Sequence, residues 1–114
     1  MSDDDRWIND MKFHGQEAID LTSGHTREQF LNDRATQLAI THLIMIVGEA
    51  AAQVSAEQRA VLTDVPWTKI VGTRNRIVHH YFKVDQEIIW NIVSQDLPEM
   101  IAALSSLESK ENQA

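Results

Sequence analysis

The sequence predicts an all-α domain, an antiparallel bundle of four to five helices with a kink in the last one. Three observations support this prediction. Apolar residues recur at helical spacing over most of the 114 residues, no segment alternates as a half-buried strand does, and only four glycines and two prolines are available for turns. We expect a single domain over 1–108, because a chain of this length builds one core, and a frayed polar tail over 109–114.

The first helix is expected to span Asp3 to about Thr22. Its first turn holds three aspartates, which favour the positive end of the helix dipole, and Gly24 follows its end. Thr26-Arg27-Glu28-Gln29 is a sequence typical of a capping box, which starts the next helical segment. That segment extends from about Glu28 to Val54 and is apolar on two faces, as in a helix central to its bundle or at a subunit interface.

The two faces of this segment differ in composition. One face is wholly apolar and is expected to contact the core. Its residues are Ile40, Leu43, Ile44, Val47, Ala50, Ala51 and Val54. The second face, called the mixed face below, consists of Leu31, Ala35, Leu38, His42, Met45, Glu49 and Ala52. A histidine on a mostly apolar stripe is usually a core histidine, and we interpret His42 in this way.

Three further signals divide the second half of the chain. Ser55-Ala56-Glu57-Gln58 offers another capping box, for a short helix through Leu62. Pro66 suits the first turn of a helix that runs to about residue 80, and Asp85 can cap the last helix. A proline at position 98 interrupts the pattern of that last helix, so a kink is expected over 94–98.

Composition narrows the range of functions. Ten Lys and Arg against 17 Asp and Glu give a net charge of −7, which argues against a general basic coat for duplex DNA but allows a local basic groove. With no cysteine, the chain has no disulfide and no thiolate nucleophile. The acidic start lacks the charge of a signal peptide, and polar residues interrupt the most apolar stretch, 39–54. We therefore expect a cytoplasmic domain that does not enter a membrane.

The segment from Trp67 to Tyr81 holds the residues best suited to chemistry. Projected at about 100° per residue, its apolar side chains form one stripe with Arg74 near the centre. A permanently charged side chain at that place needs a partner, a subunit interface or a ligand. Asn75 shares a face with His79 one turn later. Together with Tyr81, these polar side chains fringe the apolar stripe, which suits the wall of a cleft.

On spacing alone, a structural explanation of Arg74 stays open. Its guanidinium could form an internal bracket with Glu49 while Tyr81 merely packs, since an Arg followed five residues later by a His is a weak motif. Arg76 and Lys69 could line a groove or be ordinary solvated charges. The remaining histidines show no spacing with carboxylates that is typical of a metal site, so no metal is expected.

The run Arg74-Asn75-Arg76-Ile77-Val78-His79-His80-Tyr81 resembles the Arg-x-x-x-x-His-x-Tyr signature of HepT-type toxins, within the HEPN superfamily. The resemblance covers about Asp10 to Leu107 and is specific as a combination, although each motif alone is weak. His80 lies within the signature and is assigned no role. The other segments similar to such sequences, in order, are Glu28-Gln29-Phe30-Leu31, Gly48-Glu49-Ala50, Pro66-Trp67, Ile70-Val71-Gly72, Val84-Asp85, Ile89-Trp90 and Asp96-Leu97-Pro98.

The resemblance implies a HEPN-like fold and an endoribonuclease that uses no metal and no cofactor. It implies a homodimer in which two copies of the signature meet in one cleft, with Arg74 and His79 as catalytic residues. The enzyme would be the toxin of a type VII toxin–antitoxin pair. Its antitoxin would be a minimal nucleotidyltransferase of the MntA type, which transfers AMP to Tyr81. Asn75 and Glu49 would support the site, Glu49 by pairing with Arg74.

Cleavage of RNA by its own 2′-OH explains why these residue types suit the reaction. The enzyme must take a proton from the 2′-OH, give one to the leaving 5′-oxygen and stabilise charge on the phosphoryl oxygens. Histidine has an ordinary pKa of about 6.5 and suits proton transfer, while the fork of arginine matches phosphate. Two alternatives stay open. One is a non-catalytic protein-interaction subunit of a nucleotidyltransferase complex, and the other is a nucleotide-binding protein that does not cut RNA.

Overall fold

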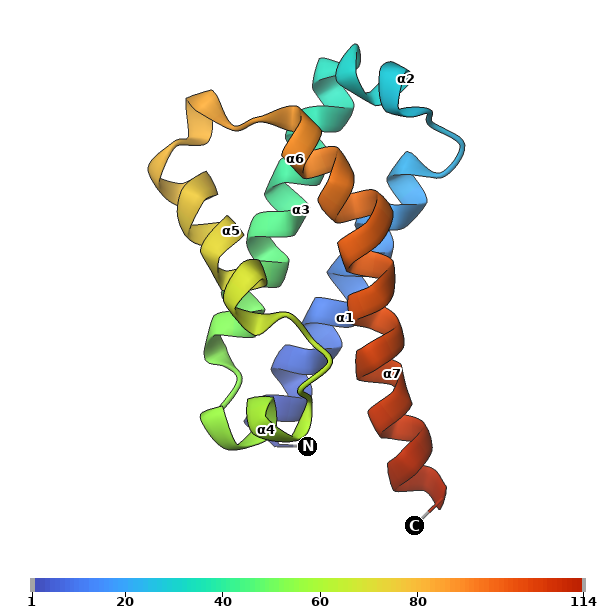
Figure 1. Ribbon diagram of the computed structural model, residues 1–114, viewed down its shortest axis with the longest axis vertical. Coiled ribbons are helices and arrows are strands. Elements are labelled where there is room, and N and C mark those ends of the chain that lie inside the picture. The colour runs from blue at the N-terminus through green and yellow to red at the C-terminus, as the bar shows by residue number, and fades with distance from the viewer. Residues whose placement is uncertain (1, 114) are drawn as a thin grey trace.

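The structure is an antiparallel helical bundle, as predicted. The computed structural model describes the backbone of residues 2–113 and the side chains of residues 2–106. Its long helices run in alternating directions along a body of 47 × 30 × 21 Å (Figure 1). Helix α1 (Asp3–Thr22) lies between α3 (Arg34–Gln53) and α7 (Leu97–Gln113), and α3 packs in turn against α5 (Trp67–His79). The described residues contain no strand.

Short elements connect these long helices. Helices α2 (Arg27–Leu31) and α4 (Ala56–Val61) lie at opposite ends of the bundle (Figure 1). A 3-10 turn, η1 (Tyr81–Lys83), follows α5 and leads to α6 (Gln86–Asn91). A π-helical turn, η2 (Ile92–Asp96), then joins α6 to α7, so that the last three elements form one long helical path.

The hydrophobic core is centred on α3, which packs against α1 on one side and α5 on another. All seven residues of the predicted apolar face of α3 are buried. By length and composition α3 is also long and apolar enough to cross a membrane, but half of that stretch is buried inside the bundle, as in a core helix. The largest fully buried side chains are Met11, Phe30, Ile40, Val47, Ile77, Ile89, Val93, Leu97, Met100 and Leu104.

The segment expected as one helix from Glu28 to Val54 is broken in two, so that prediction was wrong at its start. Asp33 begins α3, where its carboxylate accepts hydrogen bonds from the hydroxyl and the N–H of Thr36, at 2.6 and 3.1 Å. These two bonds lower the pKa of Asp33, because they favour the ionised carboxylate. Gln37 donates to two carbonyls at the end of α2, at 3.0 Å each, which satisfies groups that the break would leave unpaired.

The other predicted boundaries are confirmed. The first capping box, at Thr26, is complete, α5 begins directly after Pro66, and Asp85 caps α6. Ser55 caps α4 by accepting from the N–H of Gln58, which is one of the two hydrogen bonds of the predicted capping box. The hydroxyl and N–H of Ser55 in turn donate to the carboxylate of Asp4 in α1, at 2.6 and 2.9 Å, so α4 is tied to the first helix.

The predicted kink near Ser94–Pro98 takes the form of the π-helical turn η2. Pro98 has no N–H to donate, and the N–H of Leu97 reaches back to the carbonyl of Ile92, which widens the turn. Helix α7 then continues to Gln113. The frayed tail at 109–114 stays a prediction, because residue 114 and the side chains from 107 onward lie outside what the structure describes.

Candidate active site

Arg74 extends from α5 at a point where this helix approaches α3 closely. A Cβ atom added to Gly48 of α3 would lie 2.3 Å from the Cβ and 2.9 Å from the Cγ of Arg74. It would also lie 3.3 Å from the carbonyl oxygen of Ile70. No other amino acid fits at position 48 without moving the helices apart. Gly48 therefore sets the spacing of the two helices and, with it, the position of Arg74.

The guanidinium of Arg74 is only weakly paired. Its Nη1 donates to Oε1 of Glu49 at 3.4 Å, so the contact expected for an internal bracket is present but long. Its Nε is buried and has no hydrogen-bond partner among the described residues. A guanidinium has five N–H donors, and the contact with Glu49 uses one of them. An arginine held by packing and short of acceptors is suited to bind a phosphate.

His79 and Asn75 lie on the surface of the single chain. His79 is the last residue of α5, and Asn75 precedes it by one turn; both are exposed. His79 follows Arg74 by five positions, so their side chains leave the helix about 140° apart. Within the described part of the chain, the side chains of His79 and Asn75 have no hydrogen-bond or ion-pair partner. The structure brings both residues to one helix but does not enclose them in a cleft.

Tyr81 lies beyond the end of α5, so the prediction that it continues the stripe of that helix was wrong. The helix ends at His79, and Tyr81 begins the 3-10 turn η1. Its ring meets that of Phe82 edge to face, with centroids 5.9 Å apart, and Phe82 itself is 94% exposed. Tyr81 is 42% exposed. The side chain is therefore reachable from solvent and is not a core-packing residue.

The mixed face of α3 is largely uncovered in the single chain. Leu38 is 40% exposed, Met45 is half-buried, and His42 and Glu49 are exposed. The interpretation of His42 as a core histidine was therefore wrong. On α5, Val78 is likewise 50% exposed. Apolar side chains thus lie uncovered on α5, which holds Arg74 and His79, and on α3, which packs against it.

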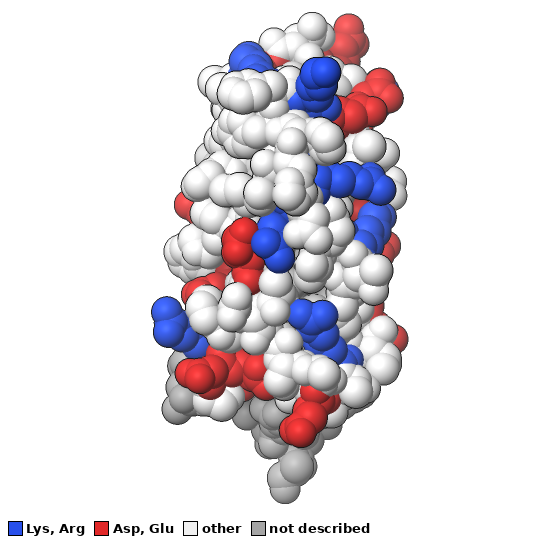
Figure 2. Space-filling model, turned by 90° about the vertical axis from the view of Figure 1, so that its left-hand side faces the viewer, with Lys and Arg blue, Asp and Glu red and all other residues white. Residues whose placement is uncertain are grey.

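Positive charge is concentrated around α5. Residues 66–83 include four Lys and Arg and no Asp or Glu, in a chain with a net charge of −7. Figure 2 views the molecule from the side of α5 and shows Lys and Arg over much of this face, interspersed with Asp and Glu. Lys69 is paired with Asp96 of η2 at 2.8 Å, so it is neutralised within the chain and does not fit the predicted role in a groove. Arg76 has no such partner in the part that the structure describes.

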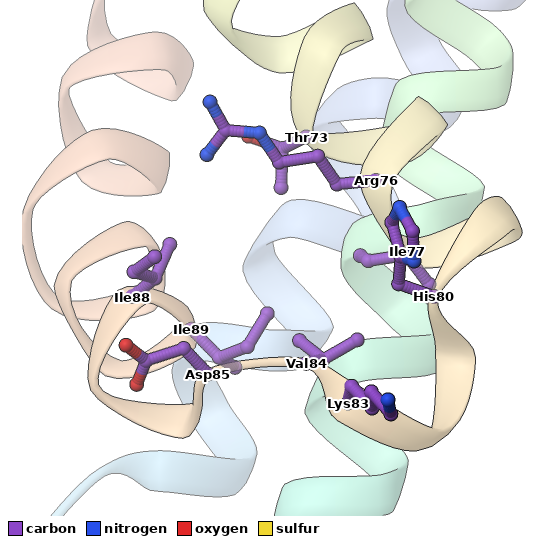
Figure 3. Close-up of a pocket in the computed structure, with 9 residues that line it drawn as sticks. All are labelled: Thr73, Arg76, Ile77, His80, Lys83, Val84, Asp85, Ile88 and Ile89. Carbon is purple, nitrogen blue, oxygen red and sulfur yellow. The ribbon is translucent and has the colours of Figure 1, made fainter.

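Sequence reasoning missed a cavity of about 330 Å³ between α5 and α6 (Figure 3). Arg76, His80 and Lys83 lie at its rim, so His80, which the sequence left without a role, belongs to this feature. The spacing of these three residues at i, i+4 and i+7 was the available signal. Among the described residues, no group of three or more His, Asp or Glu side chains is placed to hold a metal ion.

Comparison with known proteins agrees with this geometry. The chain matches the family described as Ribonuclease HepT-like over residues 14–107. It belongs to this family. The predicted resemblance to HepT-type ribonucleases of the HEPN superfamily is thus confirmed, and the chain is an endoribonuclease of this type.

Several relatives of this HepT-like ribonuclease are similar over most of their length. A probable ribonuclease HepT of Thermococcus cleftensis is 33% identical, over 74% of this chain and 80% of that protein. Two proteins that are provisionally named as RNases come from Caldanaerobacter subterraneus and Methanocaldococcus jannaschii. The first is 31% identical to this chain, over 82% of this chain and 83% of its own length. The second is 30% identical, over 89% of this chain and 84% of its own length. No solved structure shows a significant match.

Proposed function

We propose that this chain is the toxin of a type VII toxin–antitoxin pair, a cytoplasmic endoribonuclease that cleaves RNA without a metal ion. One observation carries the proposal. Arg74 is fixed by the close contact with Gly48, is weakly paired with Glu49 and has a buried Nε without an acceptor, on a chain of the HepT-like ribonuclease family. Such a guanidinium is ready to donate hydrogen bonds to the oxygens of a phosphodiester.

The proposed reaction is attack of the RNA 2′-OH on the adjacent phosphorus. A neutral His79 removes the proton of the 2′-OH as the new O–P bond forms, and a protonated His79 donates a proton to the 5′-oxygen as the old P–O bond breaks. The products are a cyclic phosphate and a free 5′-hydroxyl. Arg74 stabilises the negative charge on the non-bridging oxygens, and Asn75 orients His79 or contacts a phosphate.

The proposed active form is a homodimer. One histidine cannot be base and acid at the same moment, whereas a two-fold dimer supplies two copies of His79 and Arg74. The exposed apolar side chains of the mixed face of α3, such as Leu38, and of α5, such as Val78, supply surface for such an interface. Because Glu49 lies on the mixed face beside Arg74, the interface would also bring the two guanidiniums towards one cleft. A monomeric variant with full ribonuclease activity would contradict this arrangement.

Control by a minimal nucleotidyltransferase antitoxin of the MntA type is proposed to act on Tyr81. The phenol oxygen attacks the α-phosphorus of ATP, pyrophosphate leaves, and the phenol proton passes to solvent. The exposed position of Tyr81 supports this step, since the antitoxin must reach it. A phosphate and a base added there repel and obstruct RNA. Tyr81→Phe should stay toxic and escape the antitoxin, and full silencing of this variant by the antitoxin would exclude Tyr81 as the control point.

The first experiment is expression of the chain alone in bacteria, with growth and RNA integrity as readouts. Wild type is compared with His79→Ala and with His14→Ala, a control histidine of α1 that contacts Glu17 at 3.2 Å. We expect growth arrest and RNA loss with wild type and His14→Ala, and neither with His79→Ala. Intact RNA in the presence of folded wild-type protein would instead favour a non-catalytic helical subunit of a nucleotidyltransferase complex, with Arg74 as a structural bracket to Glu49.

A further inference from the structure

The cavity between α5 and α6 has the features of a nucleotide site. We infer that it binds one unpaired nucleotide of the RNA, next to the cleaved bond, with the base on its apolar floor and a phosphate at its cationic rim. This inference rests on the proposed function, because it assigns the substrate contacts that surround the same reaction. The apolar floor, the cationic rim, the place of Arg76 on α5 and the size of the space support this inference.

The floor of the cavity is aliphatic and comes from two helices. Ile77 of α5 and Ile89 of α6 are buried beneath it, and Ile88 is 42% exposed at its mouth. Figure 3 shows these isoleucines pointing towards the same space, with Val84 closing it from below. The volume of about 330 Å³ lies at the lower end of the range for small-molecule sites, which suits a single nucleotide.

The rim of the cavity carries cations that the chain does not neutralise. Arg76, His80 and Lys83 line it, and among the described residues none of their three side chains has a hydrogen-bond or ion-pair partner. Other cations of the molecule are engaged: Arg27 pairs with Glu87, and Lys69 with Asp96. A free guanidinium and ammonium beside an apolar floor match the two halves of a nucleotide, and the imidazole ring of His80 offers a flat surface to a base.

The one carboxylate at the rim helps to orient the ligand. Asp85 lines the cavity while its Oδ1 accepts from the N–H of Glu87 at the start of α6, so it is fixed in place. Figure 3 shows it on the α6 side, away from His80 and Lys83. Its charge repels a phosphate, which leaves the cationic residues of the rim for the phosphate and the floor for the base.

The position of Arg76 links the cavity to the proposed reaction. On a helical wheel, Arg76 lies about 60° from His79 and about 40° from His80. It therefore stands between the proposed acid–base residue and the cavity. An RNA strand that passes His79 next contacts Arg76 and then the apolar floor of the cavity. An unstacked base of single-stranded RNA is the form in which proteins read RNA sequence, so the cavity selects the nucleotide beside the cut.

The test separates this inference from the proposed function by measuring binding without cleavage. His79→Ala protein is titrated with the 5′-monophosphates of adenosine, cytidine, guanosine and uridine, and binding is followed by the NMR signals of isoleucine methyl groups. We expect the signals of Ile77, Ile88 and Ile89 to move. Adding Arg76→Ala or Ile88→Asp should lower the affinity about tenfold or more, since a charged hydrogen bond or the apolar contact is lost. Lys69→Ala removes the same charge from the same helix outside the cavity and should leave the affinity unchanged.

Cleavage assays supply the second readout. In the otherwise wild-type protein, Arg76→Ala and Ile88→Asp should raise KM and change which nucleotides flank the cleavage sites. Methyl signals that move elsewhere, or equal losses with Lys69→Ala, would overturn the inference. So would normal cleavage with an unchanged site preference in both cavity variants. If the wild type binds mononucleotides in the cavity but cuts no RNA, the proposed function fails while the nucleotide site stands.

Discussion

Helix α5 has two neighbours, and it is packed tightly against one and loosely against the other. Towards α3, the contact at Gly48 leaves no room for even a methyl group. Towards α6, the same helix borders a cavity of about 330 Å³. Each side carries an arginine: Arg74 lies on the tight side, with Glu49 beside it, and Arg76 lies on the loose side without a partner among the described residues.

This difference shows how one short helix can present two arginines for two tasks. A guanidinium that must stabilise a transition state has to be held in place before the substrate arrives, and close packing does this. A guanidinium that contacts a flexible, variable part of the substrate gains from space around it. We therefore expect Arg74 to act on the rate of the chemical step and Arg76 on binding.

The largest expected effect comes from removing the two arginines separately. Arg74→Ala should lower kcat by about 10²–10³-fold, because an electrostatic contact made in the transition state is lost. Arg76→Ala should raise KM about tenfold and leave kcat within about threefold. Steady-state cleavage of one defined oligoribonucleotide measures both. Equal losses of kcat in the two variants would contradict this comparison, because the tight and the loose side of α5 would then have the same effect on the chemical step.

A smaller effect is expected from adding a methyl group to two glycines. Gly48→Ala places a Cβ 2.3 Å from the Cβ of Arg74 and should lower the free energy of unfolding by about 1–3 kcal/mol. Gly72→Ala, within α5, meets nothing within 4 Å and should raise it by about 0.5–1 kcal/mol, because alanine favours a helix. Urea denaturation of both variants measures this. Equal stability of the two would mean that α3 and α5 separate freely and that the tight side does not fix Arg74.

Much of the fold was predictable because helix ends are encoded locally. Caps at Thr26, Ser55 and Asp85 each lie within a few residues of the backbone groups that they satisfy, so the sequence shows them directly. The break before α3 was missed for a related reason. Asp33 lies inside an apolar period that continues across it, and its capping role appears only once Gln37 is seen to close the end of α2.

The site was less predictable, because its properties depend on how helices meet. The pairing of Arg74 with Glu49 could be expected from residue types, but the close contact with Gly48 depends on the spacing of α3 and α5. The cavity is likewise a space between α5 and α6. The spacing of Arg76, His80 and Lys83 could place three basic residues on one side of a helix, but it could not show that α6 leaves a space beside them. Tyr81 was placed on the helix because the apolar period includes it, although the chain leaves the helix after His79.

The smallest expected effect comes from Glu49→Gln, which tests whether packing or charge positions Arg74 on the side of α5 that faces α3. Glu49→Gln keeps the size of the side chain and removes its charge. The contact with Arg74 is long, at 3.4 Å, and Glu49 is 52% exposed, so the change should alter the free energy of unfolding by about 0–0.5 kcal/mol. Cleavage should change by about twofold or less, because we expect the close approach of Gly48 to the Cβ and Cγ of Arg74, and not the carboxylate, to set the position of this side chain.

The same urea and cleavage measurements decide the outcome, with Gly48→Ala as the reference. If packing positions Arg74, Gly48→Ala costs more stability and more activity than Glu49→Gln. If Glu49→Gln is the more damaging of the two, the ion pair is the main restraint, and Arg74 is the bracket that its residue type alone suggested. Raising the salt concentration sharpens the distinction, because an exposed ion pair weakens with salt whereas a steric contact does not.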